Sequence, residues 1–74
     1  MTTSNLVKRL AKNLKTLRQE RGLTQEEAAR LCKMEYKYYQ RYESNTPRDM
    51  RLSTLEKIAK GFGIAASALI DGDR

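Results

Sequence analysis

Apolar residues recur at spacings of three and four in the first part of the chain. Between Ser4 and Arg21 they fall at Val7, Leu10, Leu14 and Leu17. This spacing places them on one stripe of an amphipathic helix, since most of the other positions are polar or basic. Ser4 or Asn5 can cap the start of the helix, and Gly22 follows its end. The pattern therefore predicts a first helix over residues 4–21.

The next segment has the sequence signature of a helix start. Thr24 and Glu27 have the T-x-x-E spacing of a capping box, in which each side chain accepts a hydrogen bond from the other residue's backbone amide. We expect a short helix over about 25–32, whose inner face carries the small residues Ala28, Ala29 and Cys32. A turn at 33–34 follows.

All four tyrosines lie in one stretch, EYKYYQRYE at 35–43. As a strand, this stretch would mix tyrosine with polar or charged side chains on both faces. As a helix, it places Tyr39 and Tyr42 on one side. The opposite side then carries the polar side chains of Lys37, Gln40 and Arg41. Because a helix separates the two kinds of side chain better, we predict a helix here with Tyr39 and Tyr42 facing the core.

The remaining sequence predicts a loop and two further helices. Residues 44–50 include the only proline and are typical of a loop. Ser53 and Glu56 have the spacing of a second capping box, which predicts the start of a fourth helix with an inner stripe of Leu55, Ile58, Ala59 and Phe62. Gly63 ends that helix, and a short helix over about 66–70 follows. We therefore expect an all-α, five-helix fold in a single domain over 1–74, with its core at about 5–70 and a polar tail at 71–74.

The balance of charges favours an anionic partner. The chain of 74 residues carries a formal net charge of +6 and has a pI near 9.8. Basic side chains on one face bind nucleic acid because they release condensed counterions. Charge alone leaves nucleic acid and other partners equally open.

The composition gives no support to an enzyme. There is no histidine, no second cysteine for a metal site and no glycine-rich phosphate loop, so we expect no catalytic site, no metal and no cofactor. The single cysteine, Cys32, cannot form an internal disulfide, and the N-terminus lacks the long apolar core of a signal peptide. No apolar run reaches membrane-spanning length, and no small-molecule ligand is evident. These features favour a cytoplasmic protein.

Three segments in order point to a known family. They are LRQERGLTQEEAA at 17–29, RYE at 41–43 and LSTLEKIAKGFGI at 52–64. From about Leu14 to Leu69 the chain resembles the helix-turn-helix domain of the phage-repressor and Cro type, also called the XRE family. The resemblance implies a compact lambda-repressor-like domain that binds double-stranded DNA sequence-specifically and regulates transcription, for example as a repressor.

The resemblance also implies roles for particular residues. Residues 25–32 correspond to the first helix of the motif and residues 36–43 to the recognition helix, which lies in the major groove. The side chains expected to contact bases are Tyr36, Lys37, Gln40 and Arg41. Lysine and arginine donate to guanine, and glutamine pairs with adenine, which supports this assignment. Phosphate contacts are expected from Gln25, Tyr38, Arg48 and Arg51. Packing on the adjoining loop is equally open for Tyr36 and Tyr38, and a purely solvated role is open for the two loop arginines.

The resemblance also implies structural roles for residues that do not contact DNA. Arg18 and Glu43 correspond to an ion pair that links the first helix to the recognition helix in the family. Cys32 corresponds to a buried aliphatic position. Two residues depart from the family pattern. Glu35 replaces the usual serine or threonine cap of the recognition helix and brings a negative charge close to the DNA, and Lys33 replaces a turn glycine, which requires a positive φ.

We also expect a homodimer, because one recognition helix reads only a few base pairs and two half-sites give useful discrimination. Relatives often pair near the C-terminus, which suggests an interface of Ile64, Ala65, Leu69 and Ile70, with folding back onto the core as the other option. The alternative function is a partner-binding module, such as the antitoxin of a toxin-antitoxin pair, with DNA binding secondary. An RNA-binding adaptor is a third possibility.

Overall fold

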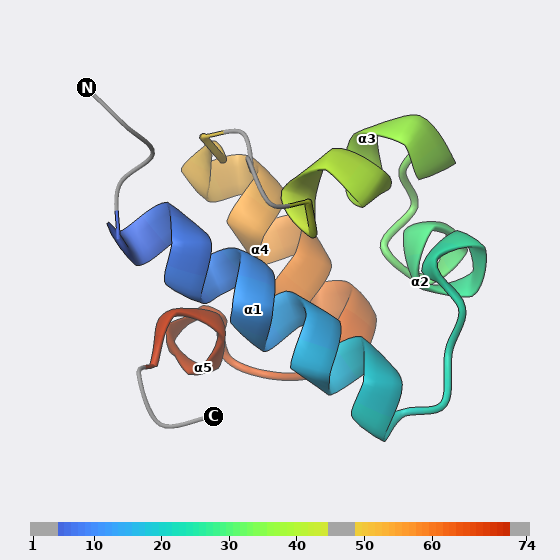
Figure 1. Ribbon diagram of the computed structural model, residues 1–74, viewed down its shortest axis with the longest axis horizontal. Helices are drawn as coiled ribbons and strands as arrows, with labels where there is room; N and C mark the ends of the chain where they lie inside the picture. The colour runs from blue at the N-terminus through green and yellow to red at the C-terminus, as the bar shows by residue number, and fades with distance from the viewer. Residues whose placement is uncertain (1–4, 45–48, 72–74) are drawn as a thin grey trace.

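The computed structural model describes residues 5–44 and 49–71, and its regular structure there is entirely α-helical (Figure 1). The helices are α1 (Asn5–Glu20), α2 (Gln25–Leu31), α3 (Tyr36–Tyr42), α4 (Leu52–Phe62) and α5 (Ala66–Ile70). The predicted all-α, five-helix fold is therefore confirmed. Four of the helices begin and end within one residue of the range expected from the sequence, and α4 begins two residues earlier than expected.

The helices fall into two groups around a common core. α2 packs against α3, and α5 packs against both α1 and α4. In Figure 1 the α2–α3 pair lies at the right and α5 at the lower left, with α1 and α4 between them. The face that α3 presents and the C-terminal helix are consequently at different sides of the molecule.

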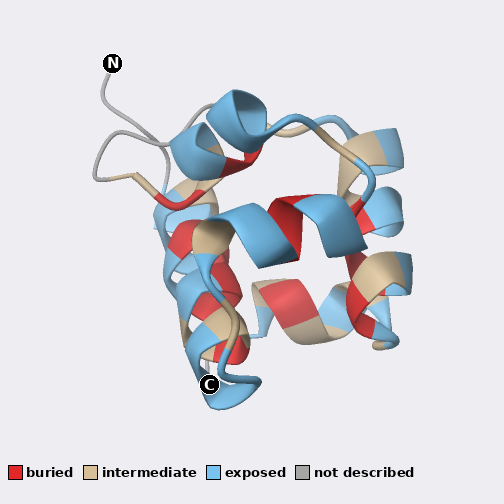
Figure 2. Ribbon diagram, turned by 90° about the vertical axis from the view of Figure 1, so that its right-hand side faces the viewer, coloured by how far each residue is buried: buried red, intermediate tan, exposed pale blue. Residues whose placement is uncertain are grey.

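The core is built from the apolar stripes of the helices. Each helix contributes a completely buried side chain, and these are Leu14, Ala28, Tyr39, Ile58 and Leu69. Figure 2 shows the buried residues on the faces that the helices turn toward one another. Removal of this apolar surface from water is the main force that holds the five short helices together.

The two predicted capping boxes have different outcomes. At α2, Thr24 Oγ1 accepts a hydrogen bond from the Glu27 amide at 3.1 Å and Glu27 Oε1 accepts one from the Thr24 amide at 2.8 Å, so this prediction is confirmed. At α4 the prediction is wrong. The N-cap is Arg51, whose carbonyl accepts the first helical hydrogen bond from the Leu55 amide at 3.0 Å and whose side chain makes no capping bond. Ser53 lies inside the first turn, too far along the helix to cap it.

α4 comes very close to the end of α2 at Gly61. A Cβ atom at this position would lie 2.8 Å from the carbonyl oxygen of Leu31 and 3.2 Å from Sγ of Cys32. Any larger residue would therefore push the two helices apart. Cys32 itself is 1% exposed, and burial raises the pKa of its thiol to about 11, so the side chain stays neutral. Its predicted place in the core is confirmed.

The C-terminal part is held by backbone geometry and one buried amide. Gly63 ends α4 in the left-handed conformation, with φ 71° and ψ 33°, which glycine adopts without strain. Asn13 of α1 is 2% exposed, and its Nδ2 donates to the carbonyl oxygens of Leu69 at 2.8 Å and Asp71 at 2.6 Å. The carbonyls at the end of a helix have no partner within it, so Asn13 both satisfies them and fixes α5 on α1.

Candidate nucleic-acid interface

α2 and α3 are joined by a tight turn with an unusual backbone conformation. The Met34 amide bonds to the Ala29 carbonyl at 3.0 Å, which closes the turn after α2. Lys33 has φ 57°, in the left-handed region that favours glycine, so the predicted positive φ is confirmed. A side chain in this conformation costs about 1 kcal/mol. The turn sets the direction in which α3 leaves α2.

α3 has one face in the core and one in solvent. Tyr39 is completely buried and Tyr42 is partly buried against the core, as the helical pattern predicts. The opposite face carries three exposed side chains, Lys37, Gln40 and Arg41. Tyr36 and Tyr38 flank this face and are 42% and 44% exposed. Lys37 Nζ lies 5.3 Å from the centroid of the Tyr38 ring, a cation–π contact. We call these five residues the α3 face.

The inner side of α3 is fixed by one carboxylate. The Glu43 side chain is fully shielded from solvent, and it accepts hydrogen bonds from three helices. Arg18 Nε of α1 donates to Oε2 at 2.8 Å, the Tyr39 hydroxyl of α3 donates to Oε2 at 2.5 Å, and Gln25 Nε2 of α2 donates to Oε1 at 3.2 Å. Arg18 also donates to the Leu23 carbonyl at 2.8 Å. The ion pair expected between Arg18 and Glu43 is thus present, as part of a larger cluster.

The pKa shifts in this cluster keep two of the donors to Glu43 protonated. The hydrogen bond to Glu43 raises the pKa of the Arg18 guanidinium. Burial, and then the hydrogen bond to Glu43, raise the pKa of the Tyr39 hydroxyl, so it remains a donor. A shielded carboxylate is stable only while its donors are in place, because their hydrogen bonds offset the loss of hydration. The cluster therefore holds α3 rigidly against α1 and α2.

The start of α2 is held by the same cluster. Gln25 is the first residue of α2, is partly buried and has its side chain oriented by Glu43. The capping hydrogen bonds with Thr24 lower the pKa of Glu27, which keeps this carboxylate ionised in the first turn. Gln25 and α3 are consequently held in a fixed position relative to each other by Glu43.

The sequence-predicted residues outside α2 and α3 have different surroundings. Arg51 is exposed and precedes α4. Arg48 lies outside the described residues. Glu35 is the N-cap of α3 and makes no side-chain capping hydrogen bond, so the expected weak cap is confirmed.

The four predicted dimer residues also separate. Ala65 is exposed, while Ile64 and Ile70 are partly buried against the core. Leu69 is completely buried. Leu69 therefore follows the other option given for these residues, folding back onto the core, because its side chain fills the core beneath α5.

Two of the contacts that hold the helices together were not predicted from the sequence. One is Asn13, which lies on the apolar stripe between Leu10 and Leu14, and an amide on such a stripe signals a buried hydrogen bond. The other is the convergence of Gln25 and Tyr39 on Glu43. Tyr39 lies four residues before Glu43, a helical spacing that brings the two side chains together, but no spacing along the chain signals the Gln25 contact, since it depends on how α2 and α3 meet.

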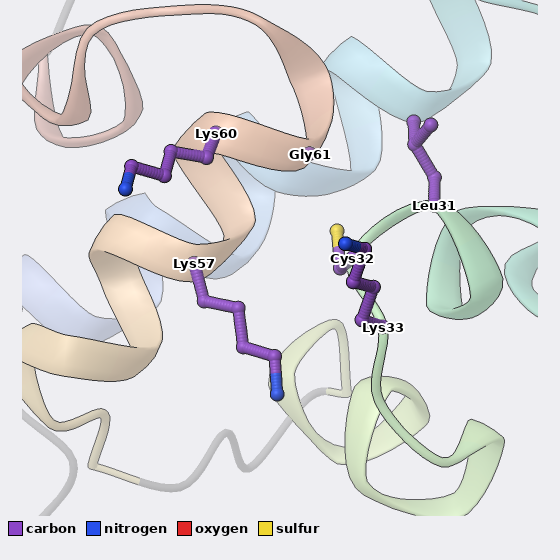
Figure 3. A pocket seen from close by; sticks show the side chains of 6 residues that line it. All are labelled: Leu31, Cys32, Lys33, Lys57, Lys60 and Gly61. Carbon is purple, nitrogen blue, oxygen red and sulfur yellow. The ribbon is translucent and has the colours of Figure 1, made fainter.

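A separate pocket has no residue of α3 in its lining. It has a volume of about 320 Å³ and lies between the end of α2 and α4 (Figure 3). Its lining consists of Leu31, Cys32, Lys33, Lys57, Lys60 and Gly61. Within residues 5–44 and 49–71, no group of three or more His, Cys, Asp or Glu side chains is placed to hold a metal ion. In the same part of the chain, no helix is long and apolar enough to cross a membrane.

A capped α2, a tight turn and an α3 with an exposed basic face, held by a buried ion pair to α1, define a DNA-binding helix-turn-helix protein. The model of the helix-turn-helix family HTH_3 matches residues 14–69. The chain belongs to this family.

Solved structures of similar proteins agree with this class. A hypothetical transcription factor from Neisseria, NHTF, is 35% identical with a TM-score of 0.80, and the match covers 88% of this chain and 72% of that one. An HTH_3 family transcriptional regulator from Vibrio cholerae is 29% identical with a TM-score of 0.82, over 92% of this chain but only 38% of that one. The restriction-modification controller protein C.Esp1396I, bound to a 19 base pair DNA duplex, is 29% identical with a TM-score of 0.78, over 89% of this chain and 87% of that one. No curated protein matches the chain significantly.

Proposed function

We propose that the protein regulates transcription by binding double-stranded DNA sequence-specifically, with α3 in the major groove. The observation that carries this proposal is the α3 face, where Lys37, Gln40 and Arg41 are exposed opposite the buried Tyr39. Rigid presentation by the Glu43 cluster supports it, since base readout requires fixed donor positions. A similar protein has been solved on duplex DNA, which supports the same partner for this chain.

Within this proposal the residues divide by task. Lys37 and Arg41 donate to guanine, Gln40 pairs with adenine, and Tyr36 contacts a base edge. Phosphates are contacted by Gln25 and Tyr38, by the exposed Arg51, and by Arg48. Sequence preference therefore comes from four residues of the α3 face, and affinity without preference comes from Tyr38 and from residues outside this face.

The assembly we propose is a homodimer on two half-sites. The exposed Ala65 and the partly buried Ile64 and Ile70 are the remaining candidates for its interface. Ile70 ends α5, and Ile64 and Ala65 directly precede it. Because α5 and the α2–α3 pair lie at different sides of the molecule, pairing through α5 leaves both α3 faces free (Figure 1). The protein would act in the cytoplasm as a repressor or other regulator, as a single domain without catalytic activity or a cofactor.

Selection of bound duplexes from a random DNA pool tests the proposal. The selected duplex, a scrambled duplex and the RNA version of the selected sequence are then titrated at two salt concentrations. We expect a site with two-fold symmetry, bound roughly a thousandfold or more tighter than the scramble. If nothing is enriched and all duplexes weaken equally with salt, the basic surface binds only nonspecifically and the proposal fails. Preference for the RNA would instead favour an RNA adaptor.

A further inference from the structure

We propose that Glu35 determines specificity by accepting a hydrogen bond from the N4 amino group of a cytosine in the major groove. This inference rests on the proposed function, because it takes α3 as the helix that enters the groove. It concerns a residue outside the α3 face, whose charge opposes DNA binding in general.

Glu35 lies close to the DNA whenever α3 enters the major groove. It is the residue immediately before Tyr36, the first residue of α3, and its backbone is extended, with φ −71° and ψ 143°. Its carbonyl accepts the first hydrogen bonds of the helix, from the Tyr38 and Tyr39 amides, both at 3.1 Å. The backbone at Glu35 is therefore as fixed as α3 itself. In helix-turn-helix complexes this end of the recognition helix lies nearest the base edges.

The carboxylate of Glu35 has no structural task in the described part of the protein. Thr24, the N-cap of α2, uses its side chain to cap that helix, whereas Glu35 caps nothing. Glu35 is exposed, and its carboxylate has neither a hydrogen bond nor an ion pair within residues 5–44 and 49–71. Glu43, by contrast, is shielded and holds three donors. The side chain of Glu35 is consequently available to a ligand.

The chemistry of the groove limits what that ligand is. A carboxylate only accepts hydrogen bonds, and phosphates, guanine N7 and O6, and thymine O4 are also acceptors, so each of them repels it. The donors on base edges in the major groove are the amino groups of cytosine and adenine. Adenine presents its N7 acceptor beside the amino group, so cytosine is the better partner. The exposed cations Lys33 and Lys37 lie two residues away on either side and reduce the repulsion from the backbone phosphates.

Glu35 would then raise the ratio of specific to nonspecific DNA affinity in two ways. At the cognate position it adds a hydrogen bond, and at every other sequence it adds repulsion without compensation. Removing its charge should tighten nonspecific binding while it abolishes the preference at one base pair in each half-site. If Glu35 only repelled DNA, removing its charge would tighten nonspecific binding and leave the base preference unchanged.

The test repeats the duplex selection with the wild-type protein, Glu35→Gln and Glu35→Ala, and with Glu26→Gln, an exposed acid on α2, as the matched control. We expect cytosine at one position of each wild-type half-site. Glu35→Gln should move that position toward adenine, and Glu35→Ala should make it indifferent, with a loss of discrimination of about tenfold or more. The other positions, and the whole site of Glu26→Gln, should not change.

A chemical probe makes the hydrogen bond itself visible. A duplex with N4-methylcytosine at the Glu35 position keeps its base pair but loses the free amino hydrogen in the groove. It should weaken the wild-type protein and leave Glu35→Ala unaffected. If all four proteins select the same site and the methyl group weakens them alike, Glu35 reads no base. If the wild-type protein selects no site at all, the proposed function fails first, which is a different result.

Discussion

At the residue scale, Glu43 shows how one side chain can set the geometry of the whole motif. Its carboxylate is the meeting point of Arg18, Tyr39 and Gln25, one residue from each of α1, α3 and α2. The ion pair with Arg18 could be predicted from the resemblance to a known family. Tyr39 lies four residues before Glu43, a spacing that brings the two together on one helix, whereas the Gln25 contact could not be predicted because it arises only when α2 and α3 have packed.

Replacement of Glu43 by glutamine should strongly destabilise the fold. The substitution removes a shielded charge that Arg18 and Tyr39 both require, and breaking a buried pair costs about 3 kcal/mol. In a domain of this size the midpoint of thermal unfolding, Tm, should fall by more than about 10 °C. Glu26→Gln, at an exposed position, is the control and should change the stability by less than about 1 kcal/mol. Equal Tm values in circular dichroism melts of the two variants would contradict the role given to Glu43.

At the scale of elements, the helices were largely predictable and their ends were less so. Apolar spacing located α1 and α4, and the chemical separation of tyrosine from basic residues identified α3 as a helix. The start of α4 was mistaken because two residues with capping chemistry, Ser53 and Glu56, lie just after the true cap. Arg51 is the N-cap through its backbone alone, and a pattern of side chains cannot predict such a cap.

The turn between α2 and α3 should be strained at Lys33. Lys33→Gly should relieve the left-handed conformation and raise the free energy of unfolding by up to about 1 kcal/mol, since glycine adopts φ 57° without a steric penalty. The control is Lys57→Gly within α4, where the same substitution should lower it by about 1 kcal/mol. Urea unfolding of both variants measures the difference. A destabilised Lys33→Gly would mean that the lysine side chain contributes more than its backbone costs.

The α3 face and its surroundings should respond differently to the loss of an arginine. Arg41→Ala should relax the preference at one base position by about 1–3 kcal/mol. Arg51→Ala should weaken binding to all sequences alike and reduce the salt slope by about one. Titration of the selected duplex and its single-base variants separates these effects. An unchanged preference in Arg41→Ala would refute its assignment to base readout.

At the scale of the whole molecule, the fold separates two surfaces. The α2–α3 pair and α5 lie at different sides of α1 and α4, and Asn13 fixes α5 from within (Figure 1). The sequence predicted the fold class and the residues of the α3 face. It could not predict that Leu69 points into the core while Ala65 remains outside, because both lie in a short apolar segment whose packing depends on Asn13.

The most direct measurement is to follow the backbone amide signals of the ¹⁵N-labelled protein by NMR during titration with the selected duplex, with the scrambled duplex as control. We expect the largest specific changes in α3 and at the start of α2, from Glu35 to Arg41 and at Gln25, with little change in α5 at low occupancy. Changes centred on α1 or on α5, with α3 unaffected, would contradict the proposal that α3 reads DNA.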